Sequence, residues 1–166
     1  IVKNNPDVVV IVDEAYIDFG GTSVLSLVEK YENLLVVQTF SKSRSMAGMR
    51  IGFAIGSKKL ISYMNDVKFS VNSYTMDWFT QILGAEAVRD EAYFKKCTDK
   101  IVEVREWTKE ELKKLQFTFE DSRANFIFAK HATLSGDTIF KALKERKIFV
   151  RHWNKERISD YLRISI

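Results

Sequence analysis

The stretch VVVIVDEAY, residues 8–16, carries five aliphatic residues directly into an acid pair, Asp13 and Glu14. A strand with one face in water alternates apolar and polar residues, whereas the strand at 7–12 shows no such alternation. We therefore expect both of its faces to be buried, as in a parallel sheet covered by helices. A second run of this kind, NLLVVQTF, occupies residues 33–40.

The order of the remaining segments predicts two kinds of architecture. A short helix at 23–31, the strand at 33–40, a polar loop, a strand at 50–56 and a following helix give α/β order. Residues 75–115 have helical periodicity, and we expect two successive helices or one bent helix. Strands at 116–120, 124–129, 147–151 and 160–166, with a helix at 135–146, form an α+β unit. We place the domain boundary within the long helical stretch of 75–115, near residue 75 or somewhat later, and take 1–75 and 76–166 as the two domains.

Composition excludes several classes of protein. The net charge is +4, and the 26 basic and 22 acidic residues alternate along the helical stretches, which indicates solvated helix faces rather than a nucleic-acid surface. No apolar run is long enough to span a bilayer. The single cysteine, Cys97, cannot form an internal disulfide, and a reduced cytoplasmic setting is expected. Ile1 at the start and a final strand at the end suggest a piece of a longer protein.

A buried strand that ends in an acid pair is compatible with two kinds of site. It can hold the magnesium ion of an ATPase, but the phosphate-binding loop that such a site requires does not occur in this sequence. It can also direct one carboxylate at the ring nitrogen of an organic cofactor. The acid pair alone does not choose between these hypotheses.

The loop TFSKSRSMAGMRIG, residues 39–52, favours the second hypothesis. In an open α/β sheet, ligands bind at the carboxyl ends of the strands, and two such ends would bring Asp13, Tyr16, Ser41 and Lys42 together. A lysine amine can condense with an aldehyde. A carboxylate can pair with a protonated pyridine nitrogen, and a serine hydroxyl with the guanidinium of Arg50 suits a phosphate ester. These are the groups that a protein supplies to pyridoxal phosphate (PLP). No metal site is expected.

The motifs DEAY (13–16), TFSKSRSMAG (39–48), GMRIGF (48–53), SRANFIF (122–128) and DYLRIS (160–165) occur in one order over almost the whole chain. In these motifs the sequence resembles PLP-dependent aminotransferases of class I/II, fold type I, closest to the group around histidinol-phosphate aminotransferase. The resemblance implies an aspartate-aminotransferase-like fold, in which part of the large PLP-binding domain precedes a small α+β domain. The lysine motif is the most specific of these features.

The resemblance also implies roles for individual residues. Lys42 is similar to the Schiff-base lysine that also moves the substrate proton, and Asp13 to the partner of the ring nitrogen. Tyr16 is similar to the residue that bonds the phenolic oxygen of the cofactor. Ser41 and Arg50 resemble phosphate ligands.

Further motifs suggest how substrate is held. Arg163 resembles the arginine that binds the substrate carboxylate, with a salt bridge as the alternative. Ser122 and Asn125 match a motif at the edge of the small domain, and no direct role is assigned to them. Glu14 faces away from Asp13 on an extended chain, and we assign it no chemistry.

The expected function is transamination between an amino donor and a 2-oxo acid acceptor, with histidinol phosphate and 2-oxoglutarate as candidates. Threonine-phosphate decarboxylase shares these motifs and stays open, as does a non-catalytic module. The resemblance further implies a homodimer and N-terminal cofactor-binding elements that this sequence does not contain. We therefore expect these 166 residues by themselves to be inactive.

Overall fold

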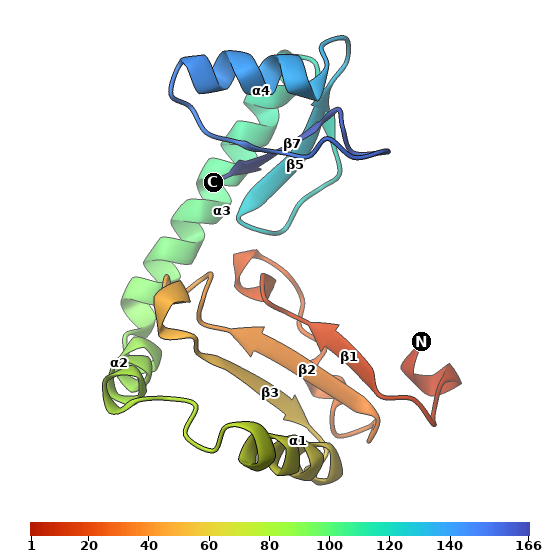
Figure 1. The fold of residues 1–166 in the computed structure, drawn as a ribbon, viewed down its shortest axis with the longest axis vertical. Coiled ribbons are helices and arrows are strands. Elements are labelled where there is room, and N and C mark those ends of the chain that lie inside the picture. The colour runs from red at the N-terminus through yellow and green to blue at the C-terminus, as the bar shows by residue number, and fades with distance from the viewer. The chain divides into compact units, whose positions relative to one another are not determined.

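A computed structural model describes all residues from 1 to 166, and their contacts divide the chain into two compact units, Ile1–Lys96 and Cys97–Ile166. The division falls inside helix α3 (Glu91–Lys114), and each unit contains its own sheet (Figure 1). None of the helices is both long and apolar enough to cross a membrane.

The division at 96/97 lies later in the chain than the boundary at residue 75 that the sequence suggested. Helix α2 (Trp78–Arg89) stays with the first unit because its side chains and backbone contact that unit. A Cβ placed on the buried Gly84 would lie 2.9 Å from Ile51 Cδ1, and Arg44 donates a hydrogen bond to the carbonyl of Ala87. The assignment of the two parts as cofactor and small domains remains a prediction.

The first unit is built on a sheet of β1 (Val10–Asp13), β2 (Leu34–Thr39) and β3 (Gly52–Gly56), in that order. The three strands lie where the sequence predicted them. Strands β1 and β2 are parallel, whereas β3 is antiparallel to β2. The parallel pairing expected for the first strand is thus confirmed, whereas β3 runs antiparallel because a parallel return needs a long crossover and the loop at 40–51 contains only a 3-10 turn, Ala47–Met49.

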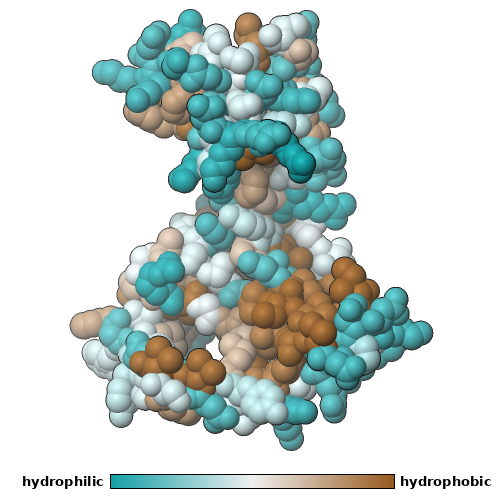
Figure 2. Space-filling model, turned by 45° about the vertical axis from the view of Figure 1, so that its right-hand side comes forward, coloured by the Kyte–Doolittle hydropathy of each residue, from teal (hydrophilic) through white to brown (hydrophobic).

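Burial differs between the two parallel strands. In β2, Leu34 and Val36 are almost completely buried, as predicted. In β1 the expectation of two buried faces is wrong, because Ile11 is 62% exposed and no second layer among these residues covers its face. Figure 2 shows hydrophobic side chains gathered over a broad area of this unit.

Helices complete the first unit. Helix α1 (Lys58–Val71) is N-capped by Ser57, whose side chain accepts a hydrogen bond from the amide of Leu60. Helix α2 is N-capped in the same way by Asp77, which accepts from the amide of Thr80. The predicted helix at 23–31 is reduced to a 3-10 turn, Leu25–Leu27. So short a segment gains too little from helix propagation to offset its nucleation.

The second unit is an antiparallel sheet with helices, as the sequence predicted. Its strands are β4 (Phe117–Phe119), β5 (Phe126–His131), β6 (Arg151–His152) and β7 (Tyr161–Ser165), in the order β4-β5-β7-β6. Helix α4 (Gly136–Glu145) joins β5 to β6. The predicted strand at 147–151 is wrong except for its last residue, since Lys147 has a positive φ of 61° and the chain turns there.

Alternation along β5 and β7 separates the two faces of this sheet. Ile127, Ala129 and Leu162 are buried on one face, where Leu112 of α3 joins the same core. The pairing of β5 with β7 places Phe126, Phe128, Lys130, Tyr161 and Arg163 on the opposite face.

Candidate functional site

The carboxyl ends of β1 and β2 meet at one edge of the first sheet. Asp13, the last residue of β1, pairs with Val37, and β2 continues to Thr39 before the chain enters the loop at 40–51. We call the loop at 40–51, which contains Lys42, the lysine loop. Because β1 and β2 are adjacent and parallel, the acid pair and the lysine loop both follow strand ends at the same edge of the sheet. The topology therefore confirms the condition on which the predicted site depended.

Hydrogen bonds close the lysine loop on itself. Thr39 Oγ1 donates to the carbonyl of Ile51 (3.2 Å) and accepts from the amide of Ser41 (3.1 Å). The carbonyl of Phe40 accepts from the amide of Met46 at 3.1 Å. The loop also contains a left-handed residue, Arg50, at φ 56°, a conformation that costs energy in any residue with a side chain. This loop is a tight and well-connected turn.

Lys42 is half-buried, and its amine lies against Tyr16. The distance from Nζ to the centroid of the tyrosine ring is 5.4 Å, which is within the range of a cation–π contact. The amine makes no hydrogen bond or ion pair with the protein. Its nitrogen is therefore available to a ligand.

Asp13, Ser41 and Arg50 are also available. One oxygen of the exposed Asp13, Oδ1, accepts from the amide of Ala15 at 2.9 Å, and Oδ2 has no protein donor. Arg50 is exposed and donates through Nη1 to the carbonyl of Ala47 at 2.9 Å. The hydroxyl of Ser41 makes no hydrogen bond with the protein, and none joins it to Arg50.

These groups fit the cofactor that the sequence resemblance implies. An aldehyde needs an amine, a pyridine nitrogen needs a carboxylate, and a phosphate ester needs hydroxyl and guanidinium donors. Lys42, Asp13, Ser41 and Arg50 provide this donor set from one sheet edge and the loop that follows it.

The sequence reasoning missed two residues beside this edge. Glu14, which we expected to have no role, is 6% exposed and accepts three hydrogen bonds. Ser43 is 4% exposed and donates its hydroxyl to the carboxylate of Asp18. The inward alternation Val10, Val12, Glu14 was the available signal for burial of the glutamate.

Arg163 lies in the second unit, on the sheet face opposite Leu162, as predicted. Its Cα pairs with those of Phe128 and Arg151, so a second arginine is its neighbour rather than an acid. The guanidinium carbon lies 4.1 Å from the centroid of the Phe126 ring, and Nε is buried without a hydrogen-bond partner. The salt bridge that was the alternative explanation of this arginine is not formed.

The motif SRANFIF surrounds a second unpaired polar atom. Ser122 donates to the carbonyl of Phe126 (2.6 Å) and accepts from the amide of Ala124 (3.2 Å), which shapes the turn before β5. Asn125 Oδ1 is buried and has no partner. Buried polar atoms are almost always hydrogen-bonded, so the unpaired atoms of Asn125 and Arg163 make both residues candidates for contact with a ligand.

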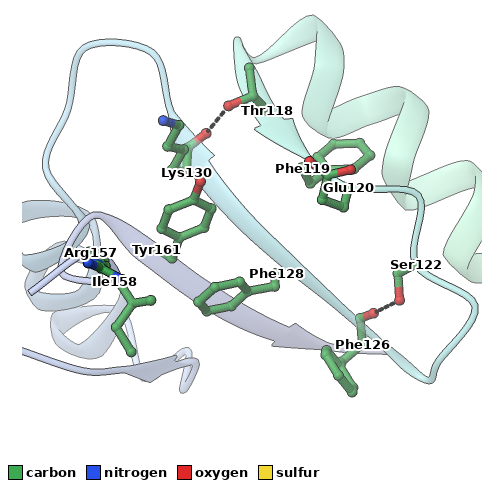
Figure 3. A pocket seen from close by; sticks show the side chains of 10 residues that line it. All are labelled: Thr118, Phe119, Glu120, Ser122, Phe126, Phe128, Lys130, Arg157, Ile158 and Tyr161. Atoms are coloured by element: carbon green, nitrogen blue, oxygen red, sulfur yellow. Dashed lines mark hydrogen bonds between the residues drawn. The ribbon is translucent and has the colours of Figure 1, made fainter. Parts of the chain in front are cut away.

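A pocket of about 680 Å³ opens on the same sheet face (Figure 3). Its wall includes Phe128 and Tyr161, which stack with their centroids 4.6 Å apart, and Lys130, whose Nζ lies 5.5 Å from the Tyr161 ring. None of the predicted catalytic, cofactor-binding or substrate-binding residues lines it, although its wall includes four residues of the motifs SRANFIF and DYLRIS, namely Ser122, Phe126, Phe128 and Tyr161.

Comparison with known proteins shows which family the chain resembles over its full length. The family model for aminotransferase class I and II matches residues 1–166. The chain is 54% identical, over its full length, to a curated histidinol-phosphate aminotransferase of Clostridium botulinum, and it covers 47% of that protein. The chain thus spans about half the length of the curated relatives it matches.

Solved structures show the same fold. Histidinol-phosphate aminotransferase from Sinorhizobium meliloti, in complex with pyridoxal-5'-phosphate, matches with a TM-score of 0.80 at 22% identity, over 93% of this chain and 43% of that one. Aspartate aminotransferase from Thermotoga maritima matches with a TM-score of 0.82 at 22% identity, over 99% of this chain and 45% of that one. The predicted aspartate-aminotransferase-like fold is confirmed.

Proposed function

Because the chain belongs to the aminotransferase class I and II family, we propose that the full-length protein is a PLP-dependent transaminase that uses histidinol phosphate as donor and 2-oxoglutarate as acceptor. The choice of donor is supported by 54% identity to histidinol-phosphate aminotransferases along the whole chain. We further propose that this reaction is a step of histidine biosynthesis.

The contact between Lys42 and Tyr16 carries the proposal. It holds an amine without hydrogen-bond or ion-pair partners beyond the edge where the two parallel strands end, and Asp13 is the last residue of β1 at that same edge. When bound, PLP supplies an electron-withdrawing ring that stabilises negative charge on the substrate α-carbon. The rest of the chemistry falls to the side chains.

Each side chain has one task. Lys42 would hold the cofactor through its amine and, once free, would move a proton from the substrate α-carbon to the carbon that bears the cofactor's aldehyde, which is the transfer that transamination requires. Asp13 keeps a proton on the ring nitrogen through its free Oδ2, and Tyr16 bonds the phenolic oxygen. Ser41 and Arg50 bind the phosphate through hydroxyl and guanidinium donors.

Arg163 is the proposed anion-binding residue for both substrates. Its guanidinium can form paired hydrogen bonds with the carboxylate of 2-oxoglutarate or with the phosphate of histidinol phosphate, which has no carboxylate. The buried Nε without a partner supports this role.

We further propose that the full-length protein is a cytoplasmic homodimer with the cofactor domain in 1–75 and the small domain from 76 onward. Exposed apolar side chains such as Ile11 and Phe79 leave surface for another part of the protein or a second subunit to cover. The 166 residues alone are expected to be inactive.

Borohydride reduction of the cofactor-loaded full-length protein tests the assignment of Lys42. Wild type and the surface variant Lys59→Ala should retain the cofactor on a peptide that contains Lys42, and Lys42→Ala should retain none. Label that remains on Lys42→Ala protein would contradict the assignment. Measuring keto product and carbon dioxide in parallel separates a transaminase from threonine-phosphate decarboxylase.

A further inference from the structure

We propose that Glu14 is a positioning residue of this site. Its buried carboxylate holds the segment that presents Asp13 and Tyr16 against the strand that leads to Lys42. The inference rests on the proposed function, since it concerns the same site, and it gives a role to the member of the acid pair that had none.

Three donors converge on the carboxylate of Glu14. Oε1 accepts from the amide of Val24 at 2.7 Å, and Oε2 accepts from the hydroxyl of Ser23 at 2.8 Å and from Nε2 of Gln38 at 2.9 Å. All three donors are neutral, and the glutamate makes no ion pair. A buried carboxylate without such donors would be strongly destabilising, so the arrangement is built around it.

The bond from Gln38 joins two parts of the chain that carry site residues, and a backbone bond of Glu14 supports it. The amide of Glu14 donates to the carbonyl of Val37 at 2.8 Å, which extends the β1–β2 ladder by one residue beyond Asp13. Gln38 immediately precedes Thr39, whose hydroxyl accepts from the amide of Ser41 at the start of the lysine loop. Glu14 thus ties the end of β1 to the part of β2 from which Lys42 is presented.

A second hydrogen bond encloses the contact between Tyr16 and Lys42. Asp18 accepts from the hydroxyl of Ser43, the residue that follows Lys42. Tyr16 lies between Glu14 and Asp18 in the chain. The segment that carries it is therefore held to β2 on one side, through Glu14, and to the lysine loop on the other, through Asp18. The 5.4 Å distance between the amine and the ring therefore depends on both carboxylates.

A carboxylate is required here rather than an amide of the same shape. An ionised carboxylate only accepts, and its two oxygens offer about four acceptor sites, whereas glutamine replaces one oxygen with a donor. In the Glu14→Gln variant, at least one of the three groups that donate to the carboxylate would face the NH₂ group of the glutamine, and its hydrogen bond would be lost. We expect the segment that carries Asp13 and Tyr16 to shift relative to Lys42.

The test uses the full-length protein with bound PLP and the variants Glu14→Gln, Gln38→Glu and the double variant that exchanges the two side chains. Glu29→Gln, an exposed glutamate of the same unit, is the matched control. Three quantities are measured: kcat and KM with histidinol phosphate, the visible absorption of the bound cofactor against pH, and amide hydrogen exchange at Val24 and Tyr16 without cofactor.

Glu14→Gln should lower kcat by a factor on the order of 10 to 100 with a smaller change in KM, since displaced catalytic groups affect the reaction more than binding. It should also shift the pH at which the absorption changes and speed exchange at Val24. Gln38→Glu places two carboxylates together and should be worse. The double variant restores a donor–acceptor pair and should recover part of both effects.

The inference would be overturned if Glu14→Gln left the absorption–pH curve unchanged and kcat within about twofold of wild type. It would also be overturned if the loss of activity in the double variant were no smaller than the sum of the losses, as free energies, in the two single variants. If Glu14→Gln does not fold, Ser23→Ala removes one donor and should give a smaller shift in the same direction. Absence of turnover in wild type would refute the proposed function, while the absorption and exchange measurements would still judge Glu14.

Discussion

Replacing Arg163 with methionine in the full-length protein separates a ligand-binding arginine from a structural one. The change removes a buried Nε that has no hydrogen-bond partner, whose burial costs about 1–3 kcal/mol. It also removes the contact with the Phe126 ring at 4.1 Å, which contributes about 0.5–2 kcal/mol. The two terms oppose each other, so the unfolding free energy without ligand should change by less than about 1 kcal/mol.

Activity should respond very differently to the same change. Paired hydrogen bonds from a guanidinium to an anion are lost, and at about 1.5 kcal/mol for each bond, or about 3 kcal/mol in total, kcat/KM should fall about 100-fold. The matched control is Arg151→Met, because Arg151 is the exposed Cα partner of Arg163 on β6 and should leave kcat/KM within about twofold.

The assays are urea unfolding without cofactor and initial rates with histidinol phosphate. A structural arginine would give the opposite result, namely a loss of more than about 2 kcal/mol in stability together with a small change in kcat/KM for the folded enzyme. Equal loss of activity in Arg151→Met would also refute the reasoning, since it would indicate a general effect of positive charge on this face.

Three further predictions concern other parts of the chain. Ile127→Ala should lower the unfolding free energy of the second unit by about 2–5 kcal/mol and Ile127→Val by about 0.5–1.5, measured by urea unfolding, because Ile127 is fully buried. Ser43→Ala and Asp18→Ala should each lower kcat about tenfold and the double variant no further, since both remove the same hydrogen bond. Hydrogen bonds from Thr80 lower the pKa of Asp77 below its ordinary value of 3.8. The ionised carboxylate therefore stabilises the folded protein fully above pH 3.8, and this stabilisation is lost as the pH falls through the lower pKa of the folded state. The stability difference between wild type and Asp77→Asn, measured by urea unfolding, should be constant above pH 3.8 and vanish in stronger acid.

Local patterns in the sequence were sufficient for most of the elements and for the lysine motif. Strands β1, β2 and β3, the helices of 75–115 and the alternation that places Arg163 opposite Leu162 all follow from side-chain periodicity, which reports on the nearest few residues. The donor set at Lys42 was recognisable for the same reason, since Ser41, Lys42 and Arg50 lie in one short loop.

Only the tertiary structure decided how distant residues serve this site. Glu14 and Gln38 are 24 residues apart, and Asp18 and Ser43 are 25 apart, so no periodicity links them. The parallel pairing of β1 with β2 brings each pair within hydrogen-bond distance, and the short loop makes β3 antiparallel. The sequence by itself determined which residue types can perform the chemistry and singled out Asp13 from the acid pair. The tertiary structure decided that the other carboxylate, Glu14, is buried and accepts three hydrogen bonds. The physical reason is that one strand residue faces solvent while the next turns inward, where only a fully hydrogen-bonded carboxylate is stable.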